Sequence, residues 1–380
     1  MAKTFAAAKL DLGENTQLNL IEKFFRPLQQ QDLFDGLLLP RITSAGGLTY
    51  SLFKEKIPED AVPVSPVQPV NAAELVSDLT FKEPSDKVAV LLKPCEIRAL
   101  VELEKLQQVD LDHLFIIGID CIGTCERKEF KKTKQQNRQK LLDKYIEETT
   151  AGEVEVFPLR EACNFCYQPV APVSDINIGL LGGEGRTILL EANSEEGQEI
   201  LDQLALPEVD FPEGDIADQR QKIVEQVADQ KKDKWQETAE EFAENIEDIS
   251  ALIETLDLCR GCHNCRTACP ICYCRECVFT TITFEHEGRK YVEWAERKGA
   301  IKMPTDILLF HITRMNHMGL GCIACGQCES ACPSDIPLLK IFKLIGEEAQ
   351  EFFSYLPGQD IEEPFPLTTY EEDEFESCAD

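Results

Sequence analysis

The sequence has little of what hydrolytic and dinucleotide-binding enzymes usually need. Only five of its 380 residues are histidine, so acid–base catalysis has few of its common groups. It contains no Gly-x-Ser-x-Gly elbow, no His-Glu-x-x-His helix, no P-loop and no Gly-x-Gly-x-x-Gly fingerprint after a strand. These absences exclude the usual sites of nucleophilic, zinc-dependent, phosphoryl-transfer and Rossmann-type chemistry.

Long apolar stretches and excess positive charge are also missing. No window approaches the roughly 18 apolar residues of a membrane span, and the first 17 residues lack a basic segment followed by an apolar one. With 38 basic against 69 acidic residues the net charge is -31, which disfavours nucleic acid and anionic membranes and favours basic partners. We therefore expect a cytoplasmic protein with no membrane span.

Cysteine, by contrast, is abundant. Seventeen cysteines without a recognisable secretory segment indicate a reducing compartment, where thiols serve metal centres and not disulfides. Eight of them form two runs spaced Cys-x2-Cys-x2-Cys-x3-Cys-Pro, the bacterial ferredoxin pattern for 4Fe–4S clusters. The first run is Cys259, Cys262, Cys265 and Cys269, and the second is Cys322, Cys325, Cys328 and Cys332.

In this pattern three cysteines of a run hold one cube and the fourth crosses to the other. The expected ligand sets are Cys259, Cys262, Cys265 and Cys332 for one cluster, and Cys322, Cys325, Cys328 and Cys269 for the other. A single run also suits tetrahedral zinc. Two complete runs, each followed by a proline, favour the iron–sulfur interpretation, and we expect a chain that transfers electrons.

Three more cysteines, Cys272, Cys274 and Cys277, directly follow the first run. They offer thiolates for a further metal site. Their spacing of one and two residues, however, leaves a 4Fe–4S site short of a fourth ligand. The sequence leaves their role open.

The composition changes along the chain and suggests four regions. Residues 1–205 alternate apolar strand-like runs with helical patterns, which predicts an α/β domain with a mostly parallel sheet. Residues 206–257 are charged and favour helix, as in a connector, and residues 258–346 hold both cysteine runs. In the tail, 347–380, six of the last ten residues are acidic. We expect that end to be disordered, with docking to a basic partner as the alternative.

Further cysteines follow predicted strands of the α/β region. Buried strands are expected at Val88–Leu92, Leu114–Ile119 and Val154–Pro158. Because the carboxyl ends of parallel strands meet at one crevice, we predict a third 4Fe–4S cluster on the cysteines just past these strands. They are Cys95, Cys121, Cys163 and Cys166. Two alternatives stay open: Cys125 in place of Cys121, or Cys95 and Cys121 as small buried core residues.

The segment between the two runs, Val278 to Gly321, is too long for a minimal ferredoxin. A helix is expected around Ile307–Met318, carrying His311 and His317. This arrangement resembles the α-helical dicluster ferredoxins of succinate dehydrogenase and heterodisulfide reductase, in which helices embed both clusters. Each histidine is a candidate donor to a cluster sulfur, or simply a packing or surface residue.

Three motifs of the α/β region resemble a known family. They are Lys-Pro-Cys-Glu-Ile-Arg-Ala-Leu from Lys93, Asp-Cys-Ile-Gly-Thr-Cys from Asp120, and Cys-Asn-Phe-Cys from Cys163. Together they resemble the β subunits of deazaflavin-coenzyme-reducing hydrogenases and dehydrogenases, over about residues 36–205. With the two cysteine runs added, the whole resembles the formate dehydrogenase β subunits.

The resemblance implies an electron-transfer subunit that holds flavin adenine dinucleotide (FAD) beside an iron–sulfur cluster. In the family the flavin exchanges hydride with the deazaflavin coenzyme, and the clusters carry single electrons to or from a catalytic subunit. Loops rich in glycine and nearby cations are the candidates for binding the flavin pyrophosphate, although such loops are also ordinary turns. The candidate residues are Gly46, Gly47, Lys93, Arg98, Gly182, Gly183, Gly185 and Arg186.

Three functional hypotheses remain. The first is an oxidoreductase β subunit with FAD and three clusters, linking a formate dehydrogenase or hydrogenase to a soluble carrier or a heterodisulfide-reductase-like partner. The second is an electron-transfer adaptor without flavin or substrate chemistry. The third keeps the flavin but uses NAD(P)H or ferredoxin in place of the deazaflavin.

Overall fold

A computed structural model describes residues 6–31, 33–82, 86–183, 185–204, 206–209, 214–285, 287–299 and 305–369. The chain forms two compact units. The first, here called the sheet unit, comprises Met1–Trp235 and Gly358–Asp380; the second, the helical unit, is Gln236–Pro357. The acidic end expected to be disordered, Glu371–Asp380, lies outside the described residues.

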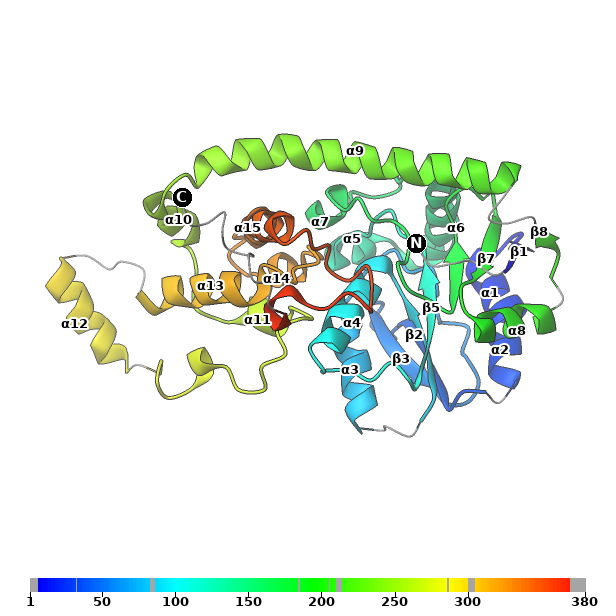
Figure 1. The fold of residues 1–380 in the computed structure, drawn as a ribbon, viewed down its shortest axis with the longest axis horizontal. Coiled ribbons are helices and arrows are strands. Elements are labelled where there is room, and N and C mark those ends of the chain that lie inside the picture. Colours follow the sequence, from blue (N-terminus) through cyan, green and yellow to red (C-terminus); the bar gives the residue numbers. More distant parts are fainter. Residues whose placement is uncertain are drawn as a thin grey trace. The chain divides into compact units, whose positions relative to one another are not determined.

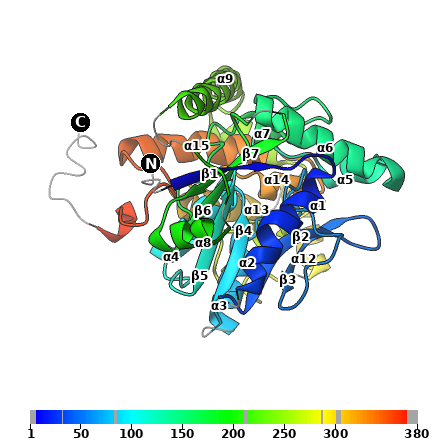
Figure 2. The ribbon, with the colours of Figure 1, turned by 90° about the vertical axis from the view of Figure 1, so that its right-hand side faces the viewer.

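Among the described residues, the sheet unit contains eight strands in the order β3-β2-β4-β5-β6-β7-β1-β8. Figure 2 labels β1 to β7. Their bounds are β1 Ala6–Asp11, β2 Gly36–Ile42, β3 Leu48–Phe53, β4 Val88–Leu92, β5 Leu114–Ile119, β6 Ile176–Gly179, β7 Thr187–Ala192 and β8 Glu208–Val209. The α/β class is confirmed, but the sheet is mixed. Strands β2, β4, β5 and β6 are parallel, and the remaining pairs are antiparallel. The short connections β2–β3 and β6–β7 force hairpins, because parallel neighbours need a long crossover.

The central strands follow from their composition. Every residue of β4 and β5 is buried, as expected for apolar runs covered on both faces of a sheet, and these two predicted strands are confirmed. The strand expected at Val154–Pro158 was wrong: this segment has no regular structure. Strand β6 pairs with β5 instead, while Val154 and Val156 pack on the core as irregular chain.

The helices of the sheet unit cover and connect these strands (Figure 1). They are α1 Thr16–Leu20, the π-helical η1 Ile21–Phe25, α2 Arg26–Gln30, α3 Ala73–Lys82, α4 Pro94–Lys105, α5 Arg127–Lys132, α6 Gln135–Ala151, α7 Glu161–Asn164 and α8 Glu195–Leu204, with the short 3-10 turn η3 Pro366–Thr368 near the end. One main core joins α1, η1, α2 and α6 to the sheet, with Phe24, Phe25 and Phe115 fully buried in it.

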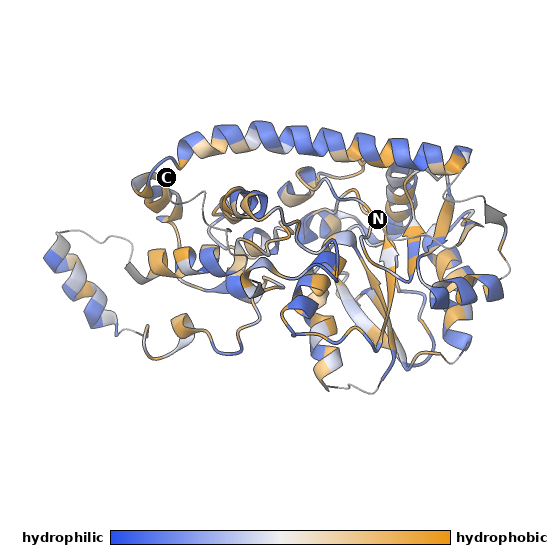
Figure 3. Ribbon diagram, viewed as in Figure 1, coloured by the Kyte–Doolittle hydropathy of each residue, from blue (hydrophilic) through white to orange (hydrophobic). Residues whose placement is uncertain are grey.

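The predicted connector is largely one helix, α9, which runs from Asp215 to Asn245. It is hydrophilic over most of its length (Figure 3). Its buried residues are few and include Arg220, Val227 and Trp235. They fall at spacings of seven and eight residues, which places them on one face of the helix.

The regular elements described in the helical unit are all helices. After α9 these are α10 Ile249–Leu256, α11 Asn264–Thr267, the 3-10 turn η2 Val278–Thr280, α12 Gly288–Lys298, α13 Thr305–Met318, α14 Gln327–Ser330 and α15 Leu338–Phe352. The helix predicted around Ile307–Met318 is α13. The short helices α11 and α14 pack together, and α15 packs on both α13 and α14. Within the described part of the chain, no helix has the length and apolar character needed to cross a membrane.

Candidate metal centres

The two cysteine runs of the helical unit form loops of matching backbone shape. In the first loop Gly261 and His263 have positive φ angles of 63° and 59°, and in the second Ala324 and Gly326 have 55° and 67°. These are equivalent positions of the two runs. Alternating left-handed residues curl a loop so that its amides point inward, as an anionic centre requires.

The structure brings the fourth cysteine of each run to the other run. Cys332 lies close enough to Cys259 and Cys265 to raise the pKa of both thiols, although burial raises them more. A cavity is lined by all four cysteines expected for the first cluster, namely Cys259, Cys262, Cys265 and Cys332. The chain thus places one thiol from the second run with three from the first.

The second group shows the reciprocal arrangement. Burial raises the pKa of Cys328 well above its ordinary value, and the next largest cause is Cys269 from the first run. Cys325 and Cys322 also raise the pKa of the Cys328 thiol. The other three cysteines expected for the second cluster therefore all lie near Cys328.

Arg314 of α13 tests whether these groups suit a cluster. Its side chain is buried, yet its Nε and Nη1 atoms have no hydrogen-bond partner among the described residues. Leaving a charged group buried without partners is costly. Cys265, Cys269 and Cys328 all raise the pKa of Arg314. Two anionic centres at the cysteine groups would supply the missing partners, so the residues fit 4Fe–4S cubes.

His311, also on α13, lies against the first group. Its Nε2 atom is 3.3 Å from the Sγ atom of Cys259, and the side chain is only 1% exposed. Burial, Arg314 and His263 lower the pKa of His311 to about 4, so the ring is neutral at pH 7. With its proton on Nε2 the ring donates to the sulfur. His317, the second candidate, is exposed.

The three extra cysteines are placed differently from one another. Cys272 lies near Cys269, and burial raises its pKa to about 12. Cys274 is exposed and Cys277 half-buried. Among the residues that the structure describes, no three His, Cys, Asp or Glu side chains group as a single metal ion would need. A cube bonds each thiolate to a different iron, so its ligands are farther apart than those of one ion.

In the sheet unit, one edge gathers most of the predicted site residues. The parallel strands β2, β4, β5 and β6 all end there, and the segments that follow them are residues 43–47, 93–95, 120–125 and 180–186. Ligand sites of open α/β sheets lie at this carboxyl edge. The cysteines after β4 and β5 and both glycine loops therefore share one side of the sheet.

The four cysteines predicted for the third cluster meet at this edge. Burial raises the pKa of Cys121 to about 12, and Cys163 and Cys166 raise it further, while Lys93 lowers it. Burial raises the pKa of the Tyr50 hydroxyl, and Cys95, in the first turn of α4, and Cys121 both raise it further. The strand expected before Cys163 does not form, yet these cysteines are grouped. The N–H of Cys121 donates to the carbonyl oxygen of Pro169 at 2.8 Å and so joins the two segments.

Hydrogen-bond donors point at two of these sulfurs. The amide Nε2 of Gln68 lies 3.2 Å from Cys95 Sγ, and Arg160 fixes that amide by donating to its oxygen at 3.0 Å. The backbone N–H of Thr124 lies 3.4 Å from Cys163 Sγ. Donors to thiolate sulfur stabilise the charged form and tune a cluster.

Cys125, the alternative ligand, belongs to the main hydrophobic core and is 1% exposed. Its N–H bonds to the carbonyl of Pro66, and burial raises its pKa to about 12. A thiol packed among apolar side chains behaves as a small hydrophobe. The geometry therefore favours Cys121 over Cys125 at the site.

Helix α9 contacts the loops that carry these cysteines through several side chains. The Nζ of Lys231 donates to the carbonyl oxygens of Ile122 and Cys163, the latter at 2.8 Å. The ring of Trp235 lies 5.3 Å from that of Phe165. Arg220 forms a buried ion pair with Asp120, which directly precedes Cys121.

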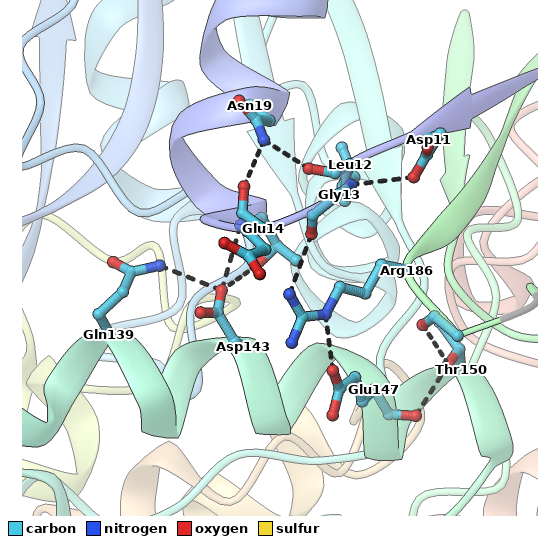
Figure 4. A network of polar contacts seen from close by, with 12 residues as sticks. Asp11, Leu12, Gly13, Glu14, Asn19, Gln139, Asp143, Glu147, Thr150 and Arg186 are labelled. Atoms are coloured by element: carbon cyan, nitrogen blue, oxygen red, sulfur yellow. Dashed lines mark hydrogen bonds and ion pairs between the residues drawn. The ribbon is translucent and has the colours of Figure 1, made fainter.

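The glycine loop after β6 is explained by packing. Gly182 has a φ angle of +78°, and a Cβ there would lie 2.6 Å from the Cα of Arg220. A Cβ at Gly183 would lie 2.2 Å from the carbonyl oxygen of Thr187. Gly185 faces open space. Arg186 hydrogen-bonds to Glu147 at 2.6 Å and to the carbonyl of Gly13 at 3.2 Å (Figure 4).

The other glycine loop, Gly46–Gly47, is the turn between β2 and β3. Gly46 has a φ angle of +74°, and the guanidinium of Arg138 lies against it. The side chain of Lys131 approaches Gly47. Two cations thus flank this turn. The remaining two candidates lie away from this turn. Lys93 lowers the pKa of Cys121. Arg98 is buried in α4, and Gly358 packs against its backbone.

Sequence reasoning missed the residues that reach the cysteines from distant segments. Gln68, Lys231 and Arg314 belong to no motif, and each lies at least 27 positions from the cysteine that it contacts. Arg160 contacts Gln68 and thereby acts indirectly. Only Thr124, inside the Asp120 motif, carried a local signal.

The chain is similar to several known proteins. Residues 85–209 match the family model for the C-terminal part of the beta subunit of coenzyme F420 hydrogenase/dehydrogenase. The β subunit of an F420-dependent formate dehydrogenase from Methanocaldococcus jannaschii is 28% identical over 80% of this chain and 81% of its own length. A chain of the F420-reducing NiFe hydrogenase complex from Methanosarcina barkeri aligns with 66% of this chain and 95% of its own length at a TM-score of 0.43 and 14% identity.

A further relative decides the family. The β subunit of F420-dependent formate dehydrogenase 1 from Methanococcus maripaludis is 30% identical over 73% of this chain and 74% of its own length. The spacing of the two cysteine runs suits iron–sulfur clusters. The chain therefore belongs to the family of coenzyme F420 hydrogenase/dehydrogenase β subunits and is a subunit of an oxidoreductase.

Proposed function

We propose that this protein passes electrons between a catalytic subunit of the formate dehydrogenase or hydrogenase type and a soluble carrier or heterodisulfide-reductase-like partner. The observation that carries the proposal is the exchange of cysteines between the two runs. Cys332 lies with the first run and Cys269 with the second, as two interleaved cubes require.

Three 4Fe–4S clusters form the proposed path. Two are held in an α-helical dicluster domain, residues 258–346, which a helical connector (206–257) joins to the α/β domain (1–205). The third is held at the carboxyl edge of the sheet by Cys95, Cys121, Cys163 and Cys166. The chain's own groups prepare these sites, because thiols from separate segments converge and Gln68 and Thr124 direct donors at two sulfurs.

FAD completes the proposed chain of carriers, because a flavin converts a two-electron hydride into single electrons that clusters accept. The Gly46–Gly47 turn is the better supported pyrophosphate site, since Arg138 and Lys131 flank it with positive charge. The hydride partner is proposed to be the deazaflavin coenzyme, as the names of the relatives suggest, with NAD(P)H or ferredoxin as the alternatives.

A flavin-free adaptor is the second candidate, and one observation favours it. The glycines at 182 and 183 are needed for close packing, and Arg186 is held by Glu147 and Gly13. These residues have structural roles that require no flavin. The two functions differ in flavin content, which can be measured directly.

The test uses anaerobically purified protein, with iron, acid-labile sulfide and released flavin counted per chain. About twelve irons and one FAD support the first function, and about eight irons without flavin after reconstitution contradict it. Cys121→Ala is expected to lose about four irons, whereas the core variant Cys125→Ala keeps all of them. Arg138→Gln is expected to retain less FAD, with Arg186→Gln as the matched control.

A further inference from the structure

Within the described, cysteine-rich part of the helical unit, Arg314 and Lys343 are the most deeply buried cations, each 5% exposed. Its Nη2 atom donates to the carbonyl oxygen of Cys265 at 3.1 Å. The guanidinium carbon lies 4.7 Å from the ring centroid of Phe342 and 5.6 Å from that of Phe310. Two aromatic faces therefore hold the guanidinium in one position.

Arg314 differs from Lys343 in having no carboxylate partner among the described residues. Lys343 pairs with Glu347. Arg314 keeps two buried nitrogens, Nε and Nη1, without a hydrogen-bond acceptor. A buried guanidinium is stable only when an anion compensates it, and the carbonyl of Cys265 carries no net charge.

The ionisable groups that interact most strongly with Arg314 are thiols of both cysteine sets, together with the nearby Cys272. Cys265 belongs to the first set, and Cys269 and Cys328 belong to the second; all three interact electrostatically with Arg314. Burial raises the pKa of the Cys269 thiol, and Arg314 lies close enough to oppose that shift. The guanidinium thus lies between the two sets.

We propose that Arg314 is the shared counter-ion of the two clusters in the helical unit and raises the reduction potential of both. The inference rests on the proposed function, since it requires both clusters. A cube held by four thiolates is an anion and becomes more negative when reduced, so a nearby fixed positive charge favours the reduced form. One charge between the two cubes shifts both potentials in the same direction.

The test is an anaerobic redox titration followed by electron paramagnetic resonance. Arg314→Gln is expected to shift the midpoint potentials of both helical-unit clusters to more negative values. Arg314→Lys keeps the charge and is expected to retain both clusters with smaller shifts. Arg289→Gln removes a charge from an exposed side chain of the same unit, 84% exposed, and is expected to change neither potential.

Several outcomes would overturn the inference while leaving the proposed function intact. These are unchanged potentials in Arg314→Gln, a shift of one cluster alone, or loss of the clusters from Arg314→Lys as well as from Arg314→Gln. Loss of clusters from Arg314→Gln alone supports it, because the charge is then what the clusters require. Wild-type protein that assembles no 4Fe–4S clusters in this unit would instead contradict the proposed function.

Discussion

The Nζ atom of Lys231 lies 2.8 Å from the carbonyl oxygen of Cys163 and also hydrogen-bonds to the carbonyl of Ile122. One ammonium on α9 therefore ties together two loops that are separated in sequence and that each carry proposed cluster ligands. Val227, one turn earlier on the same face, packs with Ile122. Helix α9 acts as a brace across the cysteine loops of the sheet unit.

Lys231→Met should weaken this brace and remove a positive charge beside the proposed third cluster. The expected result is a more negative midpoint potential for that cluster and faster loss of its iron, since fixed charge and hydrogen bonding tune such centres. Redox titration and timed iron release measure both effects. Lys232→Met, an exposed neighbour on α9, is the control. Equal behaviour of the two variants would show that Lys231 does not act on the cluster.

Arg220 should matter mainly for stability. It bonds to both Asp120 and Glu191, and none of the three side chains is more than 6% exposed. Removing one partner leaves uncompensated charge in the interior, so Arg220→Met is expected to lower the free energy of unfolding by about 3–5 kcal/mol. Urea unfolding of protein loaded with its clusters gives this value.

The control for Arg220 is Arg186→Met, which breaks the partly exposed pair with Glu147 (Figure 4). Ion pairs in contact with solvent contribute little, so this variant should unfold at nearly the wild-type urea concentration. If Arg220→Met were equally mild, the buried network would not stabilise the fold.

None of these long-range contacts was predicted from the sequence. Strands β4 and β5 could be predicted to the residue, because unbroken apolar runs such as Val88–Leu92 have few alternatives. The segment Val154–Pro158 has the same local pattern but forms no strand. Its place beside β5 belongs to β6, and competition between segments for one sheet position is not visible in a local window.

In the candidate sites, too, local motifs could be predicted from the sequence and long-range contacts could not. Spacing alone pointed to the cysteine groups, because each run is a local motif. Lys231 of α9 and Arg314 of α13 reach the cysteine loops from distant helices, so neither carried a sequence signal. The glycines at 182 and 183 misled in the opposite direction: their local pattern suggested an anion loop, while tight packing of the hairpin already requires them.

His311→Phe should alter one cluster and leave the other unchanged. The imidazole lies 3.3 Å from Cys259 Sγ, and an N–H donor to a cluster sulfur raises the reduction potential. The expected result is a more negative potential for the cluster held by Cys259, Cys262, Cys265 and Cys332 alone. His317→Phe, on the exposed side of α13, is the matched control. A shift in both clusters, or in neither, would speak against a direct hydrogen bond.

Removal of iron should loosen the helical unit more than the central strands of the sheet unit. Without clusters, Arg314 has no anion to balance its buried charge, and folding of a metal-dependent unit is coupled to its metal. Hydrogen exchange of chelator-treated protein is therefore expected to accelerate in residues 256–275 and 320–335, while β4 and β5, whose residues are all buried, stay protected. Reconstitution with iron and sulfide should restore slow exchange in both loops. If the loops stayed protected without iron, their shape would not depend on the clusters, and the buried guanidinium would need a different anion.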